Sequence, residues 1–154
     1  MSLARRGSIR LFALASAVLL GCLPAESSDD VRSFLAKTIP EQRASIAMYP
    51  ADKQIDLYLA AMHAQHPPDL GLADHVAASG AVLVPVLIRH LSIEESDLSK
   101  LLLVDVLYRM QMLGYYSVRT DPATMAALEV HVAKMKDPQW KAMAEERVEA
   151  IRRI

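Results

Sequence analysis

Apolar residues recur at intervals of three and four along most of the chain after residue 28, with polar residues between them. The clearest series is Ile55, Tyr58, Leu59 and Met62, which would lie on one face of a helix. Convincing strand-type alternation is absent, β-hairpin dipeptides do not occur, and glycine is scarce, with five residues in the chain. The pattern therefore predicts a single all-helical domain over residues 29–154.

Helix start and stop signals divide this domain into segments. A first helix is expected over residues 29–37, and Thr38-Ile39-Pro40-Glu41 has the pattern of a capping box that opens a short second helix. The next helix is expected to start at Asp52 and to end at Pro67-Pro68, and another should run from Asp69 to Gly80. A nearly all-apolar helix should follow over residues 81–91, and Gly114 should end the longest helix. The side chains expected to cap the later helices are Asp52, Asp69, Ser96 or Asp97, Asp121 before Pro122, and Asp137 before Pro138.

The second half of the chain resembles a pair of HEAT-type helical hairpins. Val82 to Ile88, a polar turn and the apolar helix from Asp97 are similar to one hairpin, and Met125 to Met135 with the last helix are similar to another. The two units are spaced by roughly 40 residues, as such repeats are. The resemblance implies a packed helical array with a protein-binding surface and no catalytic residues. The fold class expected is all-α, either an irregular helical bundle or a short HEAT-like array of about six to eight helices.

The N-terminus resembles a bacterial lipoprotein signal. Arg5, Arg6 and Arg10 precede the apolar run 11–20, which is too short for an ordinary transmembrane helix of about 20 residues. Leu19-Leu20-Gly21-Cys22 is similar to a lipobox, which implies removal of residues 1–21 and acylation of Cys22, the only cysteine. The alternatives are cleavage after Ala25 to give a soluble secreted protein, or an uncleaved anchor.

The lipoprotein resemblance also carries an expectation about location. Residues 22–28 would be the acylated cysteine and a short tether, and in a diderm host Leu23 after the cysteine implies the periplasmic face of the outer membrane. Loss of residues 1–21 removes three arginines and no acid, which leaves 14 basic against 18 acidic residues and a formal charge of −4. This charge argues against non-specific nucleic-acid binding and against electrostatic attraction to anionic lipid, so the covalent lipid would be the sole attachment.

Three groups of polar residues are candidates for chemistry. His63, His66 and Asp69 have a spacing that could ligate zinc, although helix-end histidines and a helix cap explain the same residues. Asp105 and Arg109 lie four residues apart on an otherwise apolar helix, where an internal ion pair accounts for both.

Aromatic residues beside an arginine form the third group. Tyr115 and Tyr116 follow Gly114 in the segment that leads to Arg119, a combination typical of protein interfaces, although one ring could instead close the core. Phosphate-binding glycine loops, nucleophile elbows and zinc-protease motifs are absent from the sequence, so no catalytic residue and no cofactor beyond the lipid are expected.

Taken together, these features favour a membrane-tethered periplasmic protein that binds another protein as an adaptor and is not an enzyme. An immunity protein against a toxin delivered to the envelope is a narrower form of this hypothesis. A structural envelope lipoprotein and a metal-dependent enzyme are the alternatives from other classes.

Overall fold

The computed structural model describes residues 26–154, and side chains from residue 28 onward, as an all-α domain without strands in this part of the chain. The predicted signal peptide 1–21, Cys22 and the tether up to residue 25 lie outside the described residues. The eight α-helices are α1 (Glu26–Leu35), α2 (Ile39–Ser45), α3 (Ala51–Ala64), α4 (Leu72–Ala77), α5 (Val84–Ile93), α6 (Asp97–Leu113), α7 (Pro122–Ala133) and α8 (Pro138–Arg153). Short 3₁₀ helices connect some of them, namely η1 (Ile46–Met48), η2 (Gly80–Leu83) and η3 (Val118–Thr120).

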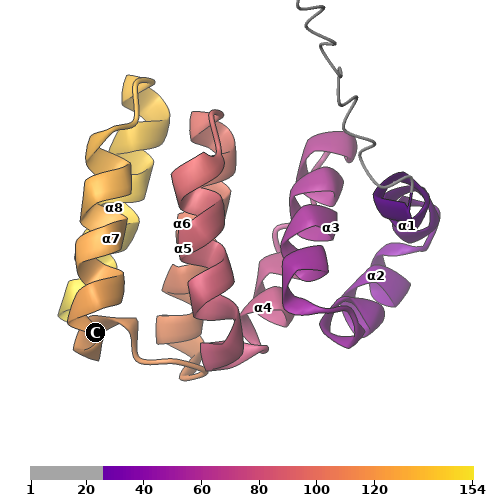
Figure 1. Cartoon of the computed structure of the whole chain (residues 1–154), viewed down its shortest axis with the longest axis horizontal. Coiled ribbons are helices and arrows are strands. Elements are labelled where there is room, and N and C mark those ends of the chain that lie inside the picture. The colour runs from indigo at the N-terminus through magenta and orange to yellow at the C-terminus, as the bar shows by residue number, and fades with distance from the viewer. Residues whose placement is uncertain (1–25) are drawn as a thin grey trace, which may run out of the picture.

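Successive helices are arranged as four pairs stacked side by side, from α1–α2 at one end to α7–α8 at the other (Figure 1). The odd-numbered helices form one layer, in which α1 packs on α3, α3 on α5 and α5 on α7. The even-numbered helices form a second layer, in which α2 packs on α4, α4 on α6 and α6 on α8. The stack therefore includes two pairs upstream of the hairpins that the sequence singled out.

The core is centred on α6, which packs against α4, α5 and α8. Five of its side chains are completely buried, namely Leu103, Val104, Val106, Leu107 and Met110. A helix that is apolar around most of its circumference is stable only when neighbours cover it on several sides. The apolar sequence of α6 therefore accounts for its central position in the stack.

Most of the local start and stop signals are confirmed. Thr38 N–H donates to the Glu41 carboxylate at 2.8 Å, and Ser96 caps α6 by accepting a hydrogen bond from Ser99 N–H. Gly114 has a left-handed backbone with φ of 74°, which glycine adopts without strain and which ends α6. Both Asp-Pro signals are also helix caps, at Asp121 for α7 and Asp137 for α8.

Two predicted caps were wrong because their carboxylates have partners distant in sequence. Helix α3 begins at Ala51 after Pro50, and Asp52 lies in its first turn, where it pairs with Arg89 of α5. Helix α4 begins only at Leu72, and the Asp69 carboxylate instead binds Arg43 of α2.

Other helix boundaries also differ from the sequence pattern. Helix α4 ends at Ala77, and residues 80–83 form the 3₁₀ helix η2. Pro85 therefore lies in the first turn of α5, where the backbone N–H that proline lacks would have no partner within the helix. Helix α1 begins at Glu26, so residues 26–28 of the expected tether are helical. Within residues 26–154, no helix has the length and apolar character needed to cross a bilayer.

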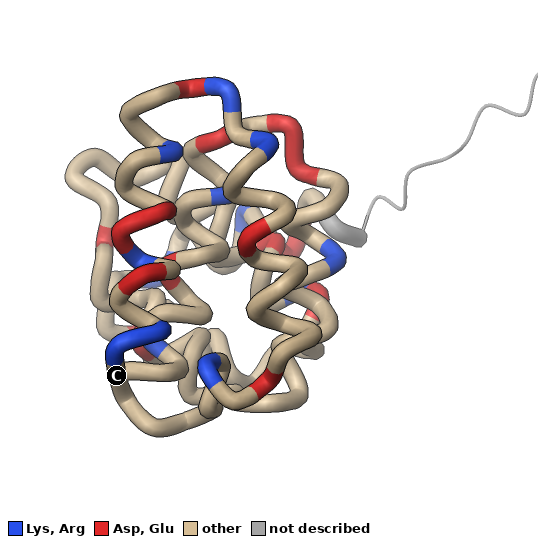
Figure 2. Tube along the Cα trace, turned by 90° about the vertical axis from the view of Figure 1, so that its left-hand side faces the viewer, with Lys and Arg blue, Asp and Glu red and all other residues tan. Residues whose placement is uncertain are grey.

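A row of charges crosses the even-numbered layer. Arg109 donates to Asp74 of α4 at 2.8 Å and to Asp105 at 3.3 Å, and Arg147 of α8 donates to Asp105 at 3.0 Å. The predicted Asp105–Arg109 pair is thus confirmed as part of a network that joins three helices. Because its members are partly exposed, each pair contributes about 0–1 kcal/mol. Acidic and basic residues are likewise interleaved over the α7–α8 end of the stack (Figure 2).

Candidate functional site

An open groove of about 450 Å³ lies between α5 and α7 on the odd-numbered layer, and we call it the α5–α7 groove. The residues that line it are Ala81, Val84, Pro85, Ile88, Tyr116, Asp121, Ala123 and Thr124. Most of these side chains are apolar, and several are small. The small residues leave space between two neighbouring helices that larger side chains would fill.

The polar part of the groove is a hydrogen-bond cluster around Asp121. Its carboxylate caps α7 by accepting from Ala123 N–H at 3.0 Å and Thr124 N–H at 3.2 Å. The Thr124 hydroxyl also donates to it, and the Tyr116 hydroxyl donates at 2.6 Å. Asp121 therefore holds the start of α7 and the Tyr116 ring in one fixed arrangement.

These donors also set the protonation states of the cluster. The Thr124 hydroxyl, followed by the Tyr116 hydroxyl, lowers the pKa of Asp121 to about 2, because each stabilises the carboxylate form. The same bond to Asp121 raises the pKa of Tyr116, since loss of the phenolic proton would place two anions together. At neutral pH the groove contains an ionised Asp121 and a neutral Tyr116.

The segment that carries the two tyrosines is held against the start of η2. Tyr115 N–H and Tyr116 N–H both donate to the Met110 carbonyl, at 3.0 and 3.3 Å. Gly80 has a φ of 63°, and a Cβ there would lie 3.1 Å from the Tyr115 carbonyl oxygen, so only glycine suits this approach. The backbone of Tyr115 is thus fixed beside η2, which contributes Ala81 to the groove.

The structure brings only one of the three predicted interface residues into the groove. Tyr116 lines it, whereas Tyr115 is 48% exposed beside the start of η2. Val82, also in η2 and next in sequence to the lining residue Ala81, is 67% exposed. The sequence also allowed that one of the two rings closes the core. Tyr116 does so in part, because it is partly buried and packs against the hydrophobic core.

Arg119 does not line the groove but lies in the same connecting segment, in η3. Its backbone N–H donates to the Gln111 side chain at 2.9 Å. Within residues 28–154, its guanidinium has no hydrogen bond or ion pair, whereas every other arginine there has at least one. Arg119 is therefore a free positive charge on a surface whose other arginines are paired.

The three residues of the candidate zinc site do not form a common site. His63 Nε2 lies 2.9 Å from the buried Ser99 hydroxyl, and His66 is exposed in the segment after α3. Asp69 is bound by Arg43, which lowers the pKa of Asp69 through a side-chain hydrogen bond. Among the described residues, no three histidine, cysteine or carboxylate side chains are placed to hold one metal ion.

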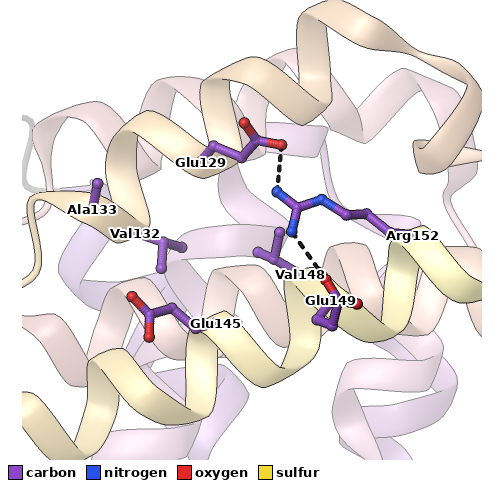
Figure 3. A pocket seen from close by; sticks show the side chains of 7 residues that line it. All are labelled: Glu129, Val132, Ala133, Glu145, Val148, Glu149 and Arg152. Carbon is purple, nitrogen blue, oxygen red and sulfur yellow. Dashed lines mark hydrogen bonds and ion pairs between the residues drawn. The ribbon is translucent and has the colours of Figure 1, made fainter.

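A second groove, of about 430 Å³, lies at the outer end of the stack between α7 and α8 (Figure 3). Val132, Ala133 and Val148 line its apolar part, while Arg152 lies across it and donates to Glu129 at 2.7 Å and Glu149 at 3.1 Å. Its polar groups are largely satisfied by each other, as expected for the solvated end of a helical stack. The α5–α7 groove, with its apolar lining, is the better candidate for a binding site.

Neither groove was predicted from the sequence. The α5–α7 groove joins residues 81–88 to residues 116–124, and only the stacking of α5 on α7 brings these segments together. The one local signal was the Tyr115-Tyr116 pair, and it pointed to the segment on one side of the groove but not to α5 on the other side.

The pKa of Asp121 predicts how acid affects the site. Because the pKa falls from 3.8 to about 2 on folding, ionised Asp121 stabilises the fold above about pH 4, and this contribution is lost as pH falls toward 2. Asp121→Asn, which retains a favourable helix cap, should flatten the dependence of unfolding free energy on pH across this window. Urea unfolding between pH 2 and 5 measures this. Asp137→Asn is the control, because within residues 28–154 the Asp137 carboxylate accepts only from Gln139 N–H and Trp140 N–H. An equal change of slope in both variants would show that the Tyr116 and Thr124 hydroxyls do not act on Asp121.

Comparison with known proteins gives no relationship from which a function could be transferred. The chain matches no protein-family model, no curated protein and no solved structure. Function is therefore inferred from the geometry of the groove and from the sequence that precedes the helical stack.

Proposed function

We propose that this protein is a lipid-anchored component of the bacterial cell envelope that binds another protein through the α5–α7 groove. The lipid on Cys22 would hold it at the periplasmic face of the outer membrane, and the helical stack would act as an adaptor without enzymatic activity. The observation that carries the proposal is the groove, an open apolar surface on a fixed framework. Val82 and Tyr115, which are next in sequence to the lining residues Ala81 and Tyr116, are also exposed.

The position of α1 supports the anchoring part of the proposal. Helix α1 begins at Glu26, so only residues 23–25 separate it from Cys22. The Cα atoms of Cys22 and Glu26 can then be at most about 14 Å apart, which keeps the start of α1 close to the lipid headgroups. Because α1 belongs to the first pair and the groove lies between the third and fourth pairs, the groove would remain accessible to a partner (Figure 1).

The chemistry of the groove supports binding rather than catalysis. A general base needs a free lone pair within reach of its substrate. Asp121 is the only carboxylate in the lining, and four donors already engage it, so it would have to break its own helix cap to act as a base. The other lining residues offer apolar contact, which suits a protein partner.

Lipid anchoring can be tested at Cys22. The wild-type protein is expected to incorporate a clickable palmitate analogue and to sediment with membranes, because two or three acyl chains anchor a protein stably. Cys22→Ser should lose both properties. Absence of label from the wild type, or membrane retention of the unlabelled Cys22→Ser protein, would contradict anchoring through this cysteine.

Partner binding can be tested by photo-crosslinking in intact cells. A photoreactive amino acid in place of Ile88, inside the groove, should give one reproducible protein adduct, whereas the same substitution at Met143 should not. Met143 is a matched control, since it is apolar and 38% exposed but lies on α8. Ala123→Arg should abolish the adduct by filling the groove. Equal adducts at the two positions, or an adduct that Ala123→Arg does not reduce, would contradict the proposed site.

A further inference from the structure

We infer that the α5–α7 groove accepts an apolar protein segment that also carries a carboxylate, and that Arg119 binds this carboxylate. The inference rests on the proposed function and adds the chemistry of the partner. Its starting point is the contrast between a groove that contains no available charge and an arginine nearby that has no partner.

The lining of the groove indicates that the side chains inserted by the partner are apolar. Val84, Pro85, Ile88 and Ala123 provide apolar contact, and the groove contains no lysine or arginine. The Asp121 carboxylate is occupied by its four donors. A charged side chain inserted here would lose hydration without gaining a counter-ion, so the inserted side chains should be apolar.

The free guanidinium of Arg119 is the reason to expect a carboxylate in the partner. It lies two residues from Asp121, so the Cα atoms of the two residues are at most about 7 Å apart. Because its guanidinium is free, it can bind a carboxylate without first breaking an internal ion pair, unlike the other arginines between residues 28 and 154. A planar guanidinium and a carboxylate are well matched for two parallel hydrogen bonds.

The net charge of the domain adds selectivity. The chain after residue 21 has a formal charge of −4, so its net charge is unfavourable for an acidic segment. Arg119 would offset this repulsion only where the segment also reaches the groove. Charge and apolar contact would thus favour the same position on the protein.

The shape of the groove favours a protein segment over a fatty acid. Small-molecule sites usually enclose most of the surface of their ligand. The α5–α7 groove is open to solvent, and the exposed residues Val82 and Tyr115 are next in sequence to its lining residues Ala81 and Tyr116. An acyl chain would remain largely in water here, whereas a protein segment could cover both the groove and these residues.

Two matched peptides test the inference on the acylated mature protein in lipid nanodiscs. They are acetyl-Leu-Ala-Leu-Glu-amide and its glutamine counterpart, which differ only in the carboxylate, and octanoate serves as the fatty-acid probe. Methyl NMR signals of Ile88 and Ala123 report binding in the groove, and the signal of the exposed Ile93 at the other end of α5 is the control. We expect shifts of Ile88 and Ala123, and about two- to five-fold tighter binding of the glutamate peptide, as for an exposed ion pair.

Variants separate the two parts of the inference. Arg119→Gln should leave binding of the glutamine peptide unchanged and reduce the affinity of the glutamate peptide to that of the glutamine peptide. Ala123→Trp, which fills the groove without adding a charge, should prevent binding of both. Equal affinity of the two peptides for the wild type would overturn the role of Arg119, and stronger binding of octanoate than of either peptide would overturn the choice of a protein segment. If neither peptide shifts Ile88, the inferred chemistry is wrong, whereas crosslinking through Ile88 in cells would still support a groove-bound partner.

Discussion

Burial of α6 is the constraint on which the rest of the structure depends. Its five completely buried apolar side chains each contribute about 1.5–3 kcal/mol of transfer free energy. The ion pairs that cross the same layer through Asp105 and Arg109 contribute about 0–1 kcal/mol each. Packing therefore decides that α4, α5 and α8 surround α6, and the charges adjust the alignment of helices that packing has already placed.

The groove is a consequence of this packing. Helices α5 and α7 belong to the pairs formed with α6 and α8, so contact between the pairs sets their separation. Small residues such as Ala81 and Ala123 then leave a depression that the surrounding helices do not close. The hydrogen bonds of Asp121 and the approach of Tyr115 to Gly80 fix the segment at its end. A surface held in this way loses little conformational entropy when a partner binds, which favours affinity.

Features encoded by neighbouring residues could be predicted from the sequence, and features encoded by the packing of distant residues could not. The Asp121 and Asp137 caps were identified because the proline after each carboxylate marks a first helical turn. Asp52 and Asp69 also precede apolar helical patterns, but they pair with Arg89 and Arg43, which are 37 and 26 positions away. No local sequence pattern indicates such distant partners. The same reason explains why the sequence drew attention to the segment that carries Tyr116, on one side of the α5–α7 groove, but not to α5 on its other side.

The central claim is that the α5–α7 groove is a fixed surface of one cooperative stack, and native-state amide hydrogen exchange tests it most directly. If α6 holds the flanking pairs together, slowly exchanging amides of α5, α6 and α7 should share one opening free energy, equal to that of global unfolding. If the α7 and α8 amides exchange through a separate opening of clearly lower free energy while α6 remains protected, the last pair moves independently. That result would contradict a preformed groove.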